Sequence, residues 1–443
     1  MATVAATMRL NTLPKRDALS GAYFWVVAFC LVYCARPEDW IPGLSLIPLA
    51  KVTGFFALVA FILSVSQGRL RYPRELIYLL LFFAQLCLTV PFAYWRGGAF
   101  WHVVNFSKGV LIIAVMMVVV NSLERLRRLM YVQAACVAMI AVATVIKGRH
   151  QPNGRLMGVL GGIYSNPNDL AFAIVLSLPL CFAFMLRTQS LVRKASWATA
   201  MMVMTYALYR TASRAGILAL VLCGAMCLWE FGVKGRRTNL LVISAVLAIL
   251  SLLVSGGTMV KRFQAMVNPE EGSRADSAAH ESFQQRWELL WRSIELTIEN
   301  PLFGVGPGNF EIVSGFWRVT HNSYTQVSSE GGLPAFILYL LILARAFQNV
   351  RGARSRFQGR TEETLYVGAL HASLIGFVVG SFFASVAYNY FPYFLIAYTT
   401  GLFTVAKSYN SAQPGPASTT PSRIPYIGNY ARKNRSEPTF SPS

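Results

Sequence analysis

Charged residues are scarce in this sequence. They make up 13% of its 443 residues, about half of the roughly 25% that soluble domains carry. A large soluble helical protein would need a polar face on most helices, and most of the apolar runs here have none. The repeated apolar runs of about 20 residues predict helices that cross a membrane.

Several site signatures are also missing. The seven cysteines lie in apolar runs, with no CxxC pair and no Cys/His metal spacing, so we expect neither a disulfide framework nor a metal site. The GVGPGNF segment has no preceding strand and no Lys-Ser or Lys-Thr, which argues against a nucleotide phosphate loop and favours a tight turn. The net charge of +21 comes without a nucleic-acid motif. We therefore expect no metal, no other cofactor and no nucleic-acid partner.

The apolar runs predict an all-α polytopic membrane protein. We expect about twelve transmembrane helices, at residues 20–35, 44–65, 75–94, 103–121, 129–146, 167–186, 196–212, 214–232, 238–256, 326–348, 364–386 and 388–406. They form one transmembrane domain, 20–407, after a cytoplasmic N-terminus, 1–19. The tail, 408–443, is rich in Pro, Ser and Asn, a composition that predicts a disordered cytoplasmic segment.

Basic clusters between the spans predict the topology. Seven segments, which are the N-terminus, every second connection between the spans and the tail, hold 24 of the 40 Lys and Arg residues. With twelve spans all seven fall on one side, which the positive-inside rule assigns to the cytoplasm. The long loop, about 257–325, then lies outside. It holds six basic and eight acidic residues, so an anion site there needs selected arginines rather than a general basic field.

The long loop contains a predicted amphipathic helix. Ser282 and Gln285 have the spacing of a capping box, and Asn300-Pro301 is expected to end the helix. One face is apolar at helical spacing and consists of Phe283, Trp287, Leu290, Ile294 and Ile298. Such a face predicts a helix at the membrane interface, or one packed across the mouth of the bundle.

Polar residues at the expected outer ends of the spans are the first site candidates. Arg214 begins a span beside Ser213 and Gly216, where backbone N–H groups also favour an anion. Arg210 ends the preceding span, where a long side chain can equally reach the interface without any role in a site. His321 opens an HNSY segment, and imidazole is the usual proton-transfer group near neutral pH.

Other candidates lie further along the chain. Arg155 shortly precedes an expected helix entry at Asn166-Pro167. Arg286 lies on the loop helix beside a tryptophan, so its head group can turn toward the bundle or toward water. Glu330 follows the candidate histidine by nine residues. Lys108 falls inside a predicted span, where a charged side chain indicates either a functional role or a long side chain that extends to the membrane surface.

Four motifs in order resemble a known family. They are GRLMGVLGGIYSNPNDLAF, RTASRAGILAL, QQRWELLWRSI followed by NPLFGVGPGNF, and HNSYTQVSSEGGLPAFILY. Together with the span count and the long external loop, they resemble the O-antigen ligase/polymerase superfamily of bacterial envelope glycosyltransferases. The resemblance covers roughly residues 40–405.

The resemblance implies a GT-C-like inner-membrane enzyme that works on the periplasmic face without a metal. Its donor would be an undecaprenyl-diphosphate-linked glycan in contact with membrane lipids. The acceptor would be lipid A-core in a ligase, or a second lipid-linked glycan in a polymerase. By motif position, the functional arginines fall on Arg214 and Arg286, and the histidine falls on His321.

These assignments agree with the chemistry of the residues. Arginine forks bind a diphosphate leaving group bidentately, and a histidine can activate an acceptor hydroxyl. We therefore expect Arg214, Arg286 and His321 to be catalytic, Arg155 and Arg210 to assist donor binding, and Glu330 and Lys108 to be supporting residues.

Three alternatives for the function remain open at this stage. An O-antigen ligase and an O-antigen or exopolysaccharide polymerase are barely separable by sequence, and the ARPEDWIPGL segment favours neither. A polysaccharide transporter or flippase is the third. It would be expected to show repeated halves and charges near the membrane midplane, and neither is evident here.

Overall fold

The chain is almost entirely helical in the computed structural model, which describes residues 18–41, 43–65, 72–150, 155–158, 164, 166–242 and 274–412. Its N-terminal half contains α2 (Ser20–Ala35), α3 (Pro37–Trp40), η1 (Leu44–Leu46), α4 (Leu49–Val65), α5 (Arg74–Thr89), η2 (Val90–Phe92), α6 (Arg96–Val119), α7 (Leu123–Lys147), α8 (Pro167–Arg187) and α9 (Leu191–Arg210). The C-terminal half contains α10 (Arg214–Cys227), η4 (Leu228–Val233), α12 (Arg274–Glu299), α13 (Phe310–Val313), α14 (Ser323–Arg356), α15 (Thr361–Gly380) and α16 (Tyr390–Ala412).

Eight helices of the described part are long and apolar enough to cross a membrane, and α4 is a shorter apolar helix. The chain is therefore a polytopic, all-helical protein, as predicted. Helices occupy all the predicted spans except 238–256, most of which lies outside the described residues, so twelve spans are not established. Of the predicted tail, residues 408–412 are wrongly assigned, because α16 continues to Ala412.

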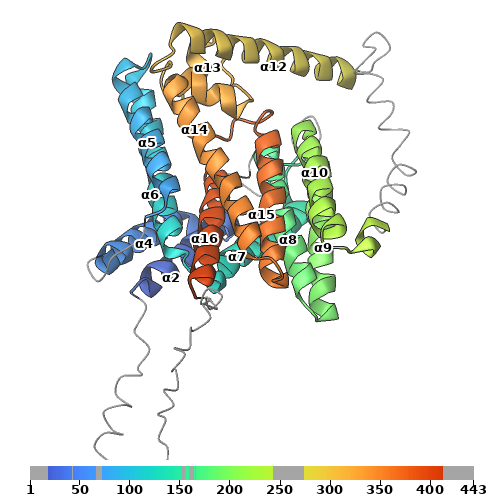
Figure 1. The fold of residues 1–443 in the computed structure, drawn as a ribbon. Helices are drawn as coiled ribbons and strands as arrows, with labels where there is room; N and C mark the ends of the chain where they lie inside the picture. Colours follow the sequence, from blue (N-terminus) through green and yellow to red (C-terminus); the bar gives the residue numbers. More distant parts are fainter. Residues whose placement is uncertain are drawn as a thin grey trace, which may run out of the picture.

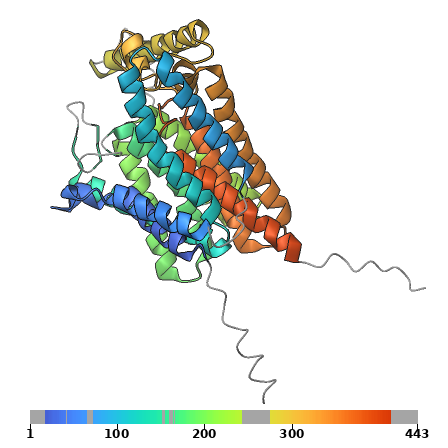
Figure 2. The same ribbon diagram turned by 90° about the vertical axis from the view of Figure 1, so that its left-hand side faces the viewer.

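The helices form one bundle with α12 lying across one end (Figures 1 and 2). Helix α15 packs between α8 and α10, and α14 packs against both α5 and α16. We call the end covered by α12 the α12 end. The opposite end holds the last turn of α14 and the first turn of α15 (Figure 1).

Ion pairs join basic clusters at the end opposite α12. Arg127 on α7 and Arg187 on α8 both bind the Glu362 carboxylate, at 3.3 and 2.7 Å. Nearby in the fold, Arg354 and Lys234 bind Glu230 at 2.7 and 3.0 Å. Clusters that are far apart in the sequence therefore lie at one end of the bundle, as the alternation of basic segments predicts. We call this end the basic end.

Helix α14 is not the single straight span that the sequence predicts. Gly332 interrupts it with φ 76° and ψ 175°. The turn after α12 fills the break, because Leu333 N–H donates to the Pro301 carbonyl at 2.7 Å and Val305 N–H donates to the Ser329 carbonyl at 2.8 Å. Irregular backbone at membrane depth is tolerated only where such partners satisfy its polar groups.

The GVGPGNF segment is the tight turn that the sequence predicts. Gly304, Gly306 and Gly308 all have positive φ, at 63°, 96° and 75°. A side chain on Gly304 would meet the backbone of Glu330 at 2.5 Å. Glycine is therefore required both for the left-handed backbone and for the close approach to α14.

We expect Gly332→Ala to abolish correct folding of this region. The φ/ψ combination is essentially restricted to glycine and costs about 1–3 kcal/mol for other residues. In addition, a Cβ would lie 2.5 Å from the carbonyl of Leu302. The yield of monodisperse purified protein should fall sharply, whereas Gly224→Ala, in a helix with nothing within 4 Å of its Cβ position, should leave it unchanged. Equal yields for the two variants would contradict this role of Gly332.

Candidate functional site

The short turn between α9 and α10 positions Arg214. Helix α9 ends at Arg210 and α10 begins at Arg214, so the close succession of the predicted spans 196–212 and 214–232 is confirmed. Ser213 caps α10 by accepting a hydrogen bond from Gly216 N–H at 3.1 Å. Ala212 has a left-handed φ of 48°, and such strain tends to accumulate at functional sites.

Asn168 ties three segments together behind this turn. Its Oδ1 accepts hydrogen bonds from Arg155 Nη2 and from Ser213 Oγ, both at 2.9 Å. Arg155 Nε also donates to the Thr211 carbonyl at 2.9 Å. Arg155 is thereby anchored to the backbone that carries Arg214. Asn168 was not predicted as a site residue; the only sequence signal is its position at the start of α8, whose predicted entry at Asn166-Pro167 is confirmed.

Helix α12 places Arg286 on its inner face. Leu289 and Ser293, three and seven residues further on, are 1% and 0% exposed, and this spacing puts all three residues on one side of the helix. Arg286 itself is half-buried. Its neighbour Trp287 faces outward and is 53% exposed. The structure thus turns Arg286 toward the bundle.

The predicted start of the loop helix is wrong. The helix begins at Arg274, so Ser282 lies inside it and cannot be its N-cap. On the predicted apolar face, Trp287 and Ile298 are 53% and 73% exposed; packing of this face on the bundle is therefore not observed, and its place at the membrane interface stays a prediction. The buried face uses Leu289 and Leu296, which pack on Val305 and Phe310 of the following turn. The predicted stop at Asn300 is correct.

His321 lies near Arg286 and has a left-handed φ of 53°. It immediately precedes Asn322, whose side chain caps α14 by accepting from Tyr324 N–H and Thr325 N–H at 2.9 and 3.2 Å. Burial, with the positive charges of Arg286 and Arg318, lowers the pKa of His321 to about 4. Its imidazole is therefore neutral at pH 7 and able to accept a proton.

Electrostatic coupling shows that residues far apart in the sequence lie close together. Burial, and then the charges of Arg214 and Arg155, lower the pKa of Arg286. Burial and the charge of Arg214 lower the pKa of Arg155 in the same way. The α7–α8 segment, the start of α10, helix α12 and the second residue before α14 therefore contribute to one group of three arginines and a histidine. We call Arg155, Arg214, Arg286 and His321 the cationic cluster.

Two arginines of the cluster lack a carboxylate partner among the described residues. Within the described part of the chain, neither Arg214 nor Arg286 forms an ion pair with a carboxylate. Arg292, on the same helix, contrasts with them because it binds Glu295 and Glu299 at 2.6 and 3.7 Å. Neighbouring arginines that form no carboxylate ion pair within the described residues, such as Arg214 and Arg286, are the arrangement expected of a site for a multiply charged anion.

The remaining candidates do not join the cluster directly. Arg210 is exposed and binds Tyr206 Oη at 2.8 Å and the His150 ring at 3.1 Å. Lys108 is exposed on α6 and donates to Asn105 Oδ1 at 2.7 Å.

Glu330 is buried at 3% exposure, and its backbone carbonyl accepts from Gly306 N–H at 3.0 Å. About 12 Å of helical rise separates it from the start of α14 beside His321. The structure therefore places Glu330 under the glycine turn rather than next to the histidine.

One comparison with known proteins matches part of the chain. Residues 199–340 match the family model Wzy_C, described as O-Antigen ligase. This confirms the resemblance over that segment, which contains Arg214, Arg286 and His321. No curated protein matches the sequence.

A chain in the solved structure described as "Structural coordination of polymerization and crosslinking by a peptidoglycan synthase complex" aligns with a TM-score of 0.44 and 17% identity. The alignment covers 77% of this chain and 99% of that chain.

Proposed function

Residues 199–340 carry an O-antigen ligase region, and from this premise we propose that the protein is an inner-membrane glycosyltransferase. It transfers a glycan from an undecaprenyl-diphosphate donor to an acceptor on the periplasmic face. The observation that carries the proposal is the cationic cluster, in which the charge of Arg214 lowers the pKa of both Arg286 and Arg155. Within the described residues neither Arg214 nor Arg286 forms an ion pair with a carboxylate. A diphosphate supplies the negative charge that the described residues around them do not.

The proposed reaction uses the cluster in two ways. The acceptor hydroxyl oxygen attacks C1 of the donor sugar and forms the new glycosidic bond. The C1–O bond to the diphosphate breaks, and its electron pair leaves with undecaprenyl diphosphate. Arg214 and Arg286 stabilise the charge that develops on this leaving group, and His321 takes the proton of the acceptor hydroxyl. Direct displacement inverts the anomeric centre.

Arg155 acts as a positioning residue in this scheme. Its contacts with Asn168 and the Thr211 carbonyl hold the turn that presents Arg214. Its charge also adds to the field at Arg286. Arg210, which faces Tyr206 and His150, is proposed only as an outer contact for the donor.

The acceptor defines two versions of the function. Lipid A-core would make the protein an O-antigen ligase, which is the version we favour from the matched family description. A second lipid-linked glycan would make it a repeat-unit polymerase. Deletion of the gene separates them: stalled polymer on the lipid carrier supports the ligase, and single-repeat glycans support the polymerase.

A transporter is the second candidate because α14 is broken at Gly332, and broken helices are common in transporters. Purified full-length protein given donor lipid and acceptor distinguishes the two activities. The glycosyltransferase proposal expects a new glycosidic product and free undecaprenyl diphosphate. Failure of transfer by protein that still moves the lipid-linked glycan across a vesicle membrane would overturn it.

The pH dependence of transfer should report His321. In the free protein its pKa is lowered to about 4, so kcat/KM should decline only as pH falls through about 4, where the base becomes protonated. Bound diphosphate offsets the charge of Arg286, which raises the histidine pKa in the complex. The acidic limb of kcat should therefore lie at higher pH than that of kcat/KM. Coincident limbs, in protein shown by circular dichroism to stay folded, would contradict the coupling.

A further inference from the structure

A second group of arginines lines a pocket at the basic end of the bundle, far from the cationic cluster. The pocket has a volume of about 180 Å³. Its lining consists of Glu124, Arg127, Arg128, Tyr131, Phe184 and Arg187. Helix α8 runs from Asn168, beside the cluster, to Arg187 at this pocket, and its 21 residues span about 31 Å. The two sites are therefore distinct.

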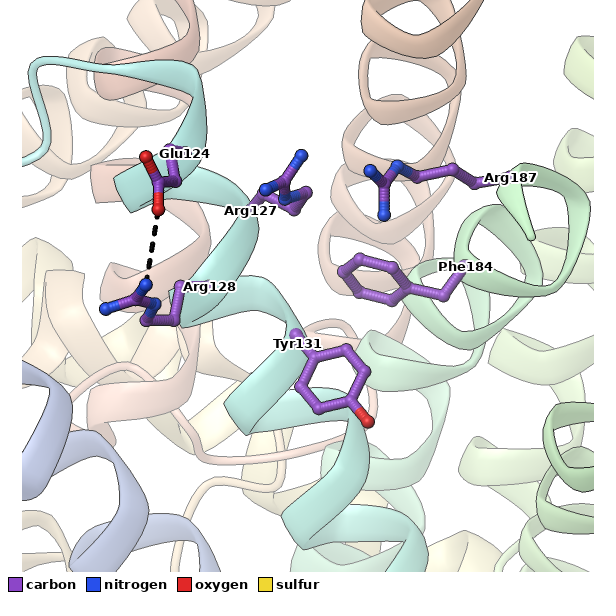
Figure 3. A pocket seen from close by; sticks show the side chains of 6 residues that line it. All are labelled: Glu124, Arg127, Arg128, Tyr131, Phe184 and Arg187. Carbon is purple, nitrogen blue, oxygen red and sulfur yellow. Dashed lines mark hydrogen bonds and ion pairs between the residues drawn. The ribbon is translucent and has the colours of Figure 1, made fainter. Parts of the chain in front are cut away.

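The arginines are only partly neutralised. Figure 3 shows Arg127 and Arg187 reaching into the same space from α7 and α8. Both bind a single oxygen, Glu362 Oε1, at 3.3 and 2.7 Å, while Arg128 binds Glu124 at 3.2 Å. Three guanidinium groups thus face two carboxylates, which leaves one excess positive charge.

The guanidinium groups also retain unused hydrogen-bonding capacity. Each carries five N–H donors in a planar fork. Among the described residues, the ion pairs with Glu362 and Glu124 engage one nitrogen of Arg127 and one of Arg128. The remaining donors suit a phosphate, which arginine binds bidentately. The positive N-terminal end of α7 lies nearby and favours an anion for the same reason.

Aromatic side chains form the apolar wall of the pocket. Phe184 and Tyr131 meet edge to face at 5.4 Å, and Phe184 stacks on Trp197 at 5.6 Å. Tyr131 is 50% exposed on the side of the bundle. The pocket therefore combines guanidinium groups with an apolar wall that exposes Tyr131, while Phe184 is 4% exposed behind it. This combination suits a molecule with a phosphate head and apolar chains.

We propose that this pocket binds the phosphate head group of an anionic phospholipid. The positive-inside tendency explains why arginines occur at this end. Glu362 brings Arg127 and Arg187 together, but the three guanidinium groups of the pocket still outnumber the two carboxylates that bind them. Basic pockets between membrane helices are suited to anionic lipid head groups. Free phosphate shares the head-group chemistry but would gain nothing from the Tyr131 and Phe184 surface.

Lipid binding to the purified full-length protein in a neutral detergent tests this proposal. The probe is dioctanoyl phosphatidylglycerol, and dioctanoyl phosphatidylcholine and inorganic phosphate are the comparisons. We expect the double variant Arg127→Gln/Arg187→Gln to bind phosphatidylglycerol at least tenfold more weakly. Arg128→Gln, whose side chain is 58% exposed and whose loss does not threaten folding, should weaken binding several-fold.

Arg193→Gln is the matched control, because Arg193 is exposed near the same end but does not line the pocket. It should bind phosphatidylglycerol as the unmodified protein does. The proposal is overturned if Arg128→Gln binds normally, or if Arg193→Gln loses as much affinity. It is also overturned if phosphatidylcholine binds equally well, or if equimolar inorganic phosphate displaces phosphatidylglycerol.

Discussion

Arg286→Ala should lower kcat for glycan transfer by about 10²–10³-fold, the effect of removing one group that stabilises developing charge. Arg286 is half-buried on the inner face of α12, and its pKa is lowered by burial and by the charges of Arg214 and Arg155. In the proposed site it stabilises the diphosphate as the C1–O bond breaks. The measurement is single-turnover transfer by purified protein with saturating donor.

Arg292→Ala is the matched control for this variant. Arg292 lies on the same helix, but Glu295 and Glu299 already neutralise it, at 2.6 and 3.7 Å. Its loss should change the rate less than twofold. Arg286→Lys keeps the charge but not the planar fork, so it should retain only part of the activity. A well-folded Arg286→Ala protein with the normal rate would remove Arg286 from the reaction.

His321→Asn should reduce the rate of transfer by about 10²–10⁴-fold, the usual contribution of a positioned general base. Asparagine is chosen because the left-handed φ of 53° at this position is tolerated by Asn better than by most residues. Folding should therefore survive while the proton acceptor is lost. Donor affinity should change little, since the diphosphate is held by the arginines.

His150→Asn provides the corresponding control. His150 contacts Arg210 on the exposed side of the turn, so its loss should leave the chemical step unchanged. If His321→Asn transferred glycan at the normal rate, the acceptor proton would have to go elsewhere. If it lost donor binding instead of rate, the histidine would belong to the diphosphate site.

The helices and the candidate cluster were largely accessible from sequence because their signals are local. Apolar runs predicted the helices, and the turn at Ala212 and the helix stop at Asn300 followed from short motifs. Arg214, Arg286 and His321 were singled out by charge, helix position and family resemblance. Their proximity was a prediction from function. It is supported by the lowered pKa of Arg286, to which Arg214 contributes, and by that of His321, to which Arg286 contributes.

Other features depend on contacts between distant segments and leave no local pattern. Gly332 sits in an apolar run that favours a continuous helix, but the turn at Pro301 supplies the hydrogen bond that makes a break possible. In the sequence, Asn168 is only part of a predicted helix start. In the structure, its side chain accepts hydrogen bonds from both Arg155 and Ser213. The sequence left open which face of α12 packs inward, and the buried contacts of Leu289 and Leu296 with the following turn decide it.

The central claim is that Arg214 and Arg286 hold one diphosphate, and a double-mutant cycle on donor binding tests it most directly. The affinity of purified full-length protein for an undecaprenyl-diphosphate-linked glycan is measured for Arg214→Ala, Arg286→Ala and the double variant. Residues that share a ligand group should show an interaction free energy of about 0.5–3 kcal/mol, so the double variant should lose less than the sum of the single losses. Losses that add to within about 0.5 kcal/mol, or unchanged affinity in either single variant, would contradict the shared site.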